Sequence, residues 1–181
     1  DEHNPFYAIY LKGLNVIYGK PGSNKTFIAL DIANRVALAN PDRVVMFTAG
    51  EGGSGLYERQ MAWETYNKKH VANFHVYDEA LPLLNPEAVE EFKFWINDVK
   101  PVFIVIDTLA RAMNGSNEND TAVMSHFVDA CDKLMRDFDC GILLVHHTNA
   151  MGYLRGSSAL DGGTDSILKV VPEDDQRIVY N

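Results

Sequence analysis

The chain has 181 residues, of which 46% are hydrophobic and 23% are charged, and this composition excludes a wholly disordered protein. No apolar run approaches the roughly 20 residues that a bilayer span needs, and the first residues lack the basic start of a secretory signal, so a cytoplasmic protein without a membrane span is expected. The net charge of −9 argues against DNA binding through overall charge, but it leaves room for a local basic surface, especially one formed between subunits.

Apolar segments rich in β-branched residues alternate along the chain with longer amphipathic segments. Strands are predicted at residues 14–18, 43–48, 74–77, 102–106, 141–145, 166–171 and 177–180. Helices are predicted at residues 26–39, 56–69, 86–99 and 120–138. Alternation of this kind implies crossover connections, so the predicted fold class is α/β, a three-layer sandwich with a mostly parallel central sheet.

Other segments are predicted to be connections. Residues 114–119 are polar and are interpreted as a mobile loop, and a turn is predicted at residues 172–175. The length suits a single domain over residues 1–181. Because the chain ends in or next to a predicted strand, this domain could be part of a longer protein.

Residues 19–26, Gly-Lys-Pro-Gly-Ser-Asn-Lys-Thr, connect the first predicted strand to the first predicted helix. The pattern of a phosphate-binding loop is Gly, four residues, Gly, Lys and Ser or Thr, and Gly19, Lys25 and Thr26 fit it. Backbone amides can hold phosphate oxygens, Lys25 can reach the outer phosphates of ATP, and Thr26 can ligate Mg²⁺. The alternative is an unrelated glycine-rich turn. The candidate nucleotide-binding residues are Gly19, Pro21, Gly22, Ser23, Asn24, Lys25 and Thr26.

Asn24 stands where the phosphate-loop pattern has its second glycine. Asparagine is one of the few residues that tolerate a left-handed backbone, so the loop is expected to form despite this departure. Pro21 and Gly22 supply a further turn just before it.

Two carboxylates follow predicted strands. Asp107 comes directly after the buried strand 102–106, at the sheet edge where open α/β sheets bind ligands, and it can hold the water shell of Mg²⁺ opposite Thr26. The alternative is an aspartate that only caps the next turn. Glu51 lies in Ala-Gly-Glu-Gly-Gly after the second strand and could polarise the attacking water as a general base. Its alternative is a solvated loop glutamate.

His146 and His147 follow the strand 141–145 and are therefore predicted to lie at the same ligand edge. One of them could hydrogen-bond the γ-phosphate, and a buried structural histidine is the alternative for each. A shared metal site is disfavoured, because adjacent strand residues point to opposite faces. Arg155, in Arg-Gly-Ser-Ser, could supply charge to a transferring phosphate in cis or across a subunit interface, contact a nucleic-acid phosphate, or pair with a neighbouring carboxylate.

Together these motifs resemble those of the RecA-like core ATPases, and most closely the hexameric replicative helicases of plasmids and phages. The resemblance rests on residues 19–26, 49–53, 102–111, 146–148 and 155–160, which occur in the family's order. It implies that the strand 141–145 lies between the strands 14–18 and 102–106, which would put the histidine pair beside the phosphate loop. It also implies that Glu51 is the catalytic base, that His147 is the γ-phosphate sensor, and that ATP and Mg²⁺ are bound.

The resemblance further implies a homo-oligomeric ring, such as a hexamer, with ATP at subunit interfaces and single-stranded DNA in the channel. The chain departs from the family where the finger arginine is expected, since it offers Asp161, Asp165 and then Lys169, so Arg155 and Lys169 are the candidates for that role. Residues 151–154, in the region that reaches DNA in the family, carry no basic residue.

The function predicted from the sequence is an ATP-hydrolysing motor domain, working as a ring-forming DNA helicase or translocase in phage or plasmid replication. The alternatives are a recombination-mediator ATPase of the same fold and a nucleotide-dependent assembly or loading module with little turnover.

Overall fold

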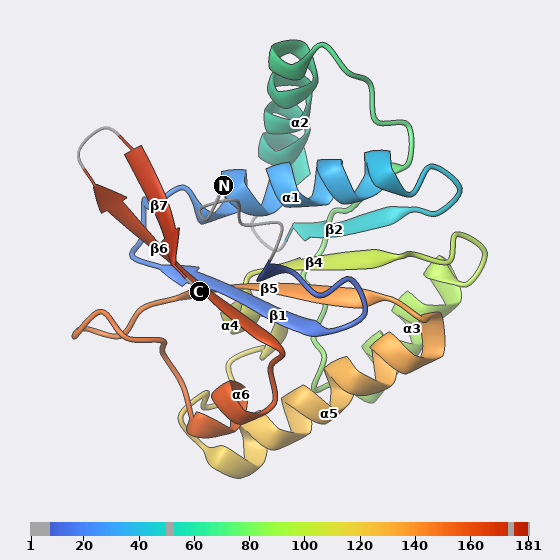
Figure 1. Ribbon diagram of the computed structural model, residues 1–181. Coiled ribbons are helices and arrows are strands. Elements are labelled where there is room, and N and C mark those ends of the chain that lie inside the picture. The colour runs from blue at the N-terminus through green and yellow to red at the C-terminus, as the bar shows by residue number, and fades with distance from the viewer. Residues whose placement is uncertain (1–7, 50–52, 174–175, 181) are drawn as a thin grey trace.

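A single mixed sheet organises the chain (Figure 1). The computed structural model describes residues 8–49, 53–173 and 176–180. In these ranges seven strands lie in the order β3-β2-β4-β5-β1-β6-β7. The parallel strands are β1 (Leu14–Gly19), β2 (Val45–Ala49), β3 (Phe74–Tyr77), β4 (Phe103–Asp107), β5 (Gly141–His147) and β6 (Ser166–Glu173). The last strand, β7 (Gln176–Tyr180), runs antiparallel to β6.

Helices cover both faces of the sheet (Figure 1). One face carries α1 (Lys25–Ala39) and α2 (Gly53–Asn67). The other carries α3 (Pro86–Ile96), α4 (Leu109–Ala112), α5 (Thr121–Phe138) and α6 (Ser158–Gly162). The predicted three-layer α/β architecture is confirmed. Among the described residues, no helix combines the length and the apolar character that crossing a bilayer requires.

Two apolar cores, one on each face, result from the alternation of side chains along the strands. In β5, Leu143 and Val145 join the core under α1, whereas Ile142 and Leu144 join the core under α5. A continuous apolar run of this kind is typical of a strand that is covered on both faces. Each face of β5 therefore has its own environment, and this decides where the residues after Val145 point.

The strand order brings the predicted site segments together. β5 lies between β1 and β4, as the resemblance implied. Its last residue, His147, pairs in register with Gly19 at the start of the phosphate loop. Asp107, at the end of β4, pairs with Val145 on one side and with Ala49 of β2 on the other. Parallel strands end at one edge, so loop, aspartate and histidine meet there.

Several details differ from the sequence prediction. The third helix ends at Ile96 rather than at residue 99, because Lys100 adopts a left-handed φ of 47° after a terminal turn. The helices α4 and α6 were not predicted, since four and five residues are too few to show helical periodicity. Strand β6 continues through Pro172, where a turn was expected. β1 ends opposite Val170, so β6 pairs there with β7 alone.

Two segments pack differently from their neighbours. Met61 is 68% exposed, because α2 buries only Gly53, Leu56 and Gln60. The predicted loop at residues 114–119 is present, and Glu118 within it is buried, with its carbonyl oxygen accepting a hydrogen bond from Ser157 N at 2.9 Å. That segment is anchored to the rest of the fold.

Candidate active site

The phosphate loop connects the end of β1 to the first turn of α1. An added Cβ at Gly19 would lie 2.6 Å from the carbonyl oxygen of Val170, so only glycine fits at that position. Gly22 and Asn24 both have left-handed backbones, with φ of 76° and 64°. Asn24 is the N-cap of α1, and its side chain makes no capping hydrogen bond. The expectation that asparagine would support the loop in this conformation is confirmed.

Lys25 is the buried cation of the loop. Its Nζ donates to the carbonyl oxygen of Lys20 at 2.8 Å and lies 3.4 Å from Ser23 Oγ. Burial lowers the pKa of Lys25, and the nearby charge of Asp107 acts in the opposite direction. The ammonium is thus held inside the loop, at the N-terminal end of α1, where the helix dipole favours an anion.

Thr26 and Asp107 meet across the sheet edge. Thr26 Oγ1, in the first turn of α1, donates to Asp107 Oδ2 at 2.7 Å. Thr26 and Asp107, which are predicted from the sequence to lie opposite each other at a metal, therefore lie in direct contact. Within the described ranges, no group of three or more His, Cys, Asp or Glu side chains could hold a metal. A hydroxyl and a carboxylate suit Mg²⁺, which takes most of its oxygen ligands from phosphate and water.

A cavity of about 330 Å³ lies over these residues. Pocket volumes of roughly 300–1,000 Å³ are usual for small-molecule ligands. The phosphate loop forms one wall and the ends of β4 and β5 form another. The predicted site residues that line the cavity are Pro21, Gly22, Asn24, Lys25, Thr26, Asp107 and His147.

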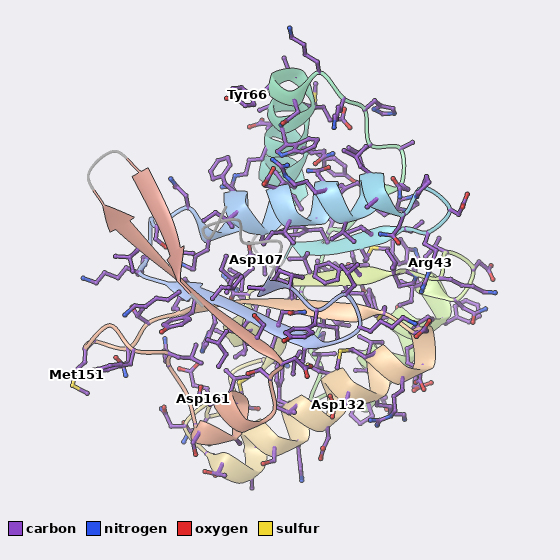
Figure 2. All side chains as sticks on the ribbon, viewed as in Figure 1. Arg43, Tyr66, Asp107, Asp132, Met151 and Asp161 are labelled. Atoms are coloured by element: carbon purple, nitrogen blue, oxygen red, sulfur yellow. The ribbon has the colours of Figure 1, made fainter. Side chains whose placement is uncertain are left out.

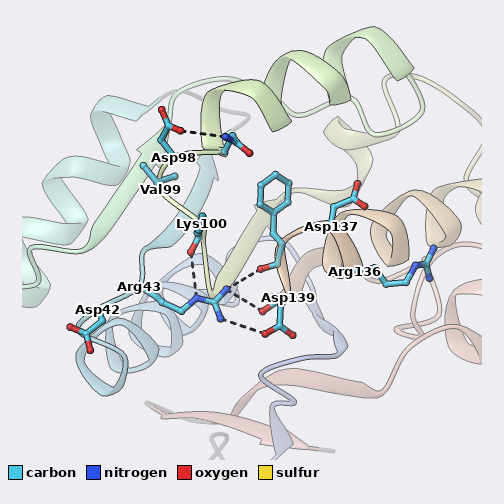
Figure 3. A pocket seen from close by; sticks show the side chains of 10 residues that line it. Asp42, Arg43, Asp98, Val99, Lys100, Arg136, Asp137 and Asp139 are labelled. Atoms are coloured by element: carbon cyan, nitrogen blue, oxygen red, sulfur yellow. Dashed lines mark hydrogen bonds and ion pairs between the residues drawn. The ribbon is translucent and has the colours of Figure 1, made fainter.

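A larger cavity, of about 520 Å³, surrounds Arg43 at the opposite edge of the sheet (Figure 3). The Arg43 guanidinium donates to the carbonyl oxygens of Pro101 at 2.8 Å, Phe138 at 2.9 Å and Asp139 at 3.1 Å. Residues 43, 101 and 139 lie just before β2, β4 and β5, so Arg43 ties together the amino ends of three strands. Its donors are used within the fold, and we interpret this cavity as a structural feature.

A family model described as "AAA domain" matches residues 8–152, which is well over half of the chain. The chain belongs to the AAA domain family. A solved structure described as an ATPase domain has a TM-score of 0.66 to it, with 16% sequence identity, and the alignment covers 91% of this chain and 72% of that one. At this identity the likeness shows the fold. A search of the curated proteins finds no match. The chain is thus a RecA-like P-loop ATPase, as the sequence motifs predicted.

His146 does not line the cavity over the phosphate loop, so the structure does not bring it together with the other candidate nucleotide-binding residues. It is fully buried, on the face of β5 opposite to His147, and its Nε2 donates to the carbonyl oxygen of Arg155 at 3.0 Å. Burial lowers the pKa of His146 to about 4. His146 is therefore a neutral structural histidine.

The two candidate finger residues also lie outside the cavity of their own chain. Arg155 forms an ion pair with Glu118, as one of the sequence alternatives, a neighbouring carboxylate, would require. Lys169 lies on β6 opposite Tyr18, with its Nζ 6.0 Å from the centroid of the Tyr18 ring. The predicted base, Glu51, lies outside the described residues.

The sequence reasoning missed one residue of the cavity wall, Arg59 of α2. Its guanidinium carbon lies 5.2 Å from the centroid of the Phe27 ring, just after the phosphate loop. An arginine over an aromatic face is attracted by the ring and is oriented by it. The available signal was a basic residue in the helix that follows Ala-Gly-Glu-Gly-Gly, where apolar periodicity alone had been considered.

Proposed function

We propose that this AAA domain is the ATP-hydrolysing motor of a ring-forming DNA helicase or translocase that acts in phage or plasmid replication. The observation that carries the ATPase part is the contact between Thr26 and Asp107 beside the buried Lys25, on the wall of one cavity. The motor part is supported by the resemblance of the motifs to replicative helicases.

The phosphates of ATP would lie over residues 19–26, with Lys25 compensating the charge of the outer phosphates. Thr26 and Asp107 would hold Mg²⁺, which supplies charge neutralisation at the phosphates. Ala49, which precedes the predicted base by two residues, ends β2 beside Asp107. This register supports a role for Glu51 in polarising the attacking water.

His147 is proposed to detect the γ-phosphate, because it lies at the end of β5 in register with Gly19. Arg59 is proposed to place a positive charge near the transferred phosphate from within the same chain. Its planar donors suit phosphate oxygens, and it lies against the Phe27 ring on the wall of the cavity.

The test is steady-state ATP hydrolysis by Lys25→Ala and Glu51→Gln variants, with Lys133→Ala as a control on the exposed face of α5. Removing the buried cation is expected to lower the rate at least about a hundredfold. Glu51→Gln is expected to lower it by about a hundredfold or more while ATP binding persists. A Glu51→Gln variant that hydrolyses ATP at the wild-type rate would refute the base assignment.

A second candidate is a nucleotide-dependent assembly or loading module with little turnover. It is favoured by one observation, the ion pair that occupies Arg155 within its own chain. Measuring ATP binding and ATP hydrolysis on the same protein distinguishes the two functions. ATP binding without hydrolysis, even at high protein concentration and with single-stranded DNA, would select the module.

A further inference from the structure

The Arg-Gly-Ser-Ser motif contacts the segment that precedes α5. Arg155, Gly156 and Ser157 lie beside Glu118, although almost 40 residues separate them in the sequence. Figure 1 shows α6, which follows this motif, lying against the start of α5. We call the set of Glu118, His146, Arg155, Gly156 and Ser157 the Glu118 junction.

Glu118 is a buried carboxylate, with 6% of its surface exposed. One of its oxygens pairs with Nε of Arg155, and the other lies 3.8 Å from Nε2 of His146. A charge removed from water is costly unless a partner compensates it, and breaking such a pair leaves the buried charge unsatisfied. Arg155 supplies the compensating positive charge, and the contact is an electrostatic one, because Oε1 of Glu118 accepts no hydrogen bond of ordinary geometry among the described residues.

Backbone contacts hold the same two segments together. Ser157 N donates to the carbonyl oxygen of Glu118 at 2.9 Å. Gly156, at a φ of 108°, passes so close that an added Cβ would lie 3.2 Å from that oxygen. His146 Nε2 binds the carbonyl oxygen of Arg155 at 3.0 Å. Arg155 is thus fixed at its backbone by β5 and at its side chain by Glu118.

The loop that this junction anchors is the connection from β5 to α6. Its two ends meet at a bridge between Thr148 and Leu154, and Arg155 N donates to the carbonyl oxygen of His147 at 3.3 Å. Its outer part exposes Met151 and Tyr153, which are 79% and 64% accessible. Figure 2 shows Met151 at the far tip of the loop, away from the sheet. One end of the loop begins directly after His147, and the other end is held by Glu118.

We propose that Glu118 is a positioning residue, whose carboxylate holds Arg155 so that the loop 148–154 moves together with the phosphate-facing end of β5. This inference rests on the proposed function, since it assigns Glu118 to the coupling between His147 and that loop. With the Glu118 charge removed, the guanidinium of Arg155 loses its carboxylate, and the end of the loop keeps only its backbone contacts and the bond to His146. A shift at His147 would then be transmitted less fully to Met151 and Tyr153.

The test compares Glu118→Gln with a control, Glu79→Gln, which neutralises an exposed glutamate elsewhere. The glutamine keeps the size of the side chain and the Glu118 carbonyl contact, so the charge is the main change. The first measurement is hydrogen–deuterium exchange. Exchange over residues 148–157 is expected to be about tenfold faster in Glu118→Gln, with no change in β1 or α1 and none anywhere in the control.

The second measurement is ATP hydrolysis, analysed as separate kcat and KM values. The Glu118→Gln variant is expected to lose about tenfold in kcat and to keep the KM for ATP within twofold, because the ion pair of Glu118 with Arg155 lies outside the phosphate loop. Adding Arg155→Gln to Glu118→Gln is expected to lower kcat no further, since both changes break the same pair. If Glu118→Gln fails to fold, Glu118→Asp, which keeps the charge but shortens its reach, is measured in the same way.

Faster exchange confined to residues 148–157, together with a lower kcat at constant KM, supports the proposal. Unchanged exchange overturns it, and so does a lower melting temperature with unchanged kcat, because that pattern describes a purely structural residue. If the wild-type chain hydrolyses no ATP, the proposed function fails. The exchange measurement then decides by itself whether Glu118 holds the loop.

Discussion

Asn24 offers a quantitative test of the phosphate loop, because its contribution can be separated into backbone and side-chain parts. Its side chain is exposed and makes no capping hydrogen bond, so what it contributes is tolerance of a φ of 64°. An ordinary L-residue in the left-handed region costs about 1–2 kcal/mol, and asparagine costs less. Asn24→Ala is therefore expected to lower the free energy of unfolding by about 1 kcal/mol.

Asn24→Gly is expected to behave differently from Asn24→Ala. Glycine adopts the left-handed backbone without strain but loses about 0.5–1 kcal/mol through the greater freedom of its unfolded state. The two terms offset each other, so stability should stay within about 0.5 kcal/mol of wild type. The affinity for ATP should stay within about twofold, since the loop keeps its shape.

The assay is urea denaturation followed by circular dichroism, with the thermal midpoint as a second reading. A loss of about 1 kcal/mol in a domain of this size corresponds to a midpoint about 2–4 °C lower. The matched control is Asn97→Ala, because Asn97 is also exposed but has an ordinary helical backbone with φ of −57°. The reasoning is refuted if Asn24→Ala is as stable as wild type, or if Asn24→Gly destabilises as much as Asn24→Ala.

Three further predictions concern the metal site, the opposite sheet edge and the buried histidine. Thr26→Ala removes the hydroxyl that lies 2.7 Å from Asp107. In a Mg²⁺ titration of ATP hydrolysis, the half-maximal Mg²⁺ concentration should be about tenfold higher. Unchanged Mg²⁺ dependence would contradict the metal assignment. Arg43→Ala leaves three carbonyl groups without their charged donor and should cost about 3 kcal/mol in urea denaturation. A cost below about 1 kcal/mol would show that Arg43 does not hold the strands together. The pKa of His146 is about 4 in the fold and 6.5 in the unfolded chain, so its stabilising contribution is full above pH 6.5 and is lost as the pH falls toward 4. Between pH 7 and pH 5 the wild type should lose about 2 kcal/mol more than His146→Gln, and parallel pH profiles would contradict the burial argument.

Part of the site could be predicted from the sequence, because open α/β sheets bind ligands at the carboxyl ends of their strands. Asp107 and His147 each follow a buried strand, and parallel strands end at one edge, so their convergence on Thr26 needed only the strand order. The same tendency made His146 a candidate, because it does not say to which face of the sheet a residue points. The alternation that argued against a shared metal site places His146 on the face opposite to His147, where it is buried and binds the carbonyl oxygen of Arg155.

The partner of Arg155 and the position of Arg59 depend on tertiary contacts, which the sequence does not show. Arg155 had several possible partners, and only the fold selects Glu118, because the pair joins segments that are distant in the chain. Arg59 reaches the cavity through the packing of α2 on α1, where Asn34 and Gln60 exchange two buried hydrogen bonds of 2.7 and 2.8 Å. That interface has too little apolar periodicity to be read from the sequence.

The measurement that tests the account most directly is the rate of ATP hydrolysis as a function of protein concentration, with and without single-stranded DNA. The proposed ring-forming motor predicts Mg²⁺-dependent hydrolysis whose rate per chain rises with protein concentration and rises further with single-stranded DNA, and which Lys25→Ala abolishes. Hydrolysis that is undetectable at every concentration, or that Lys25→Ala leaves unchanged, would contradict it.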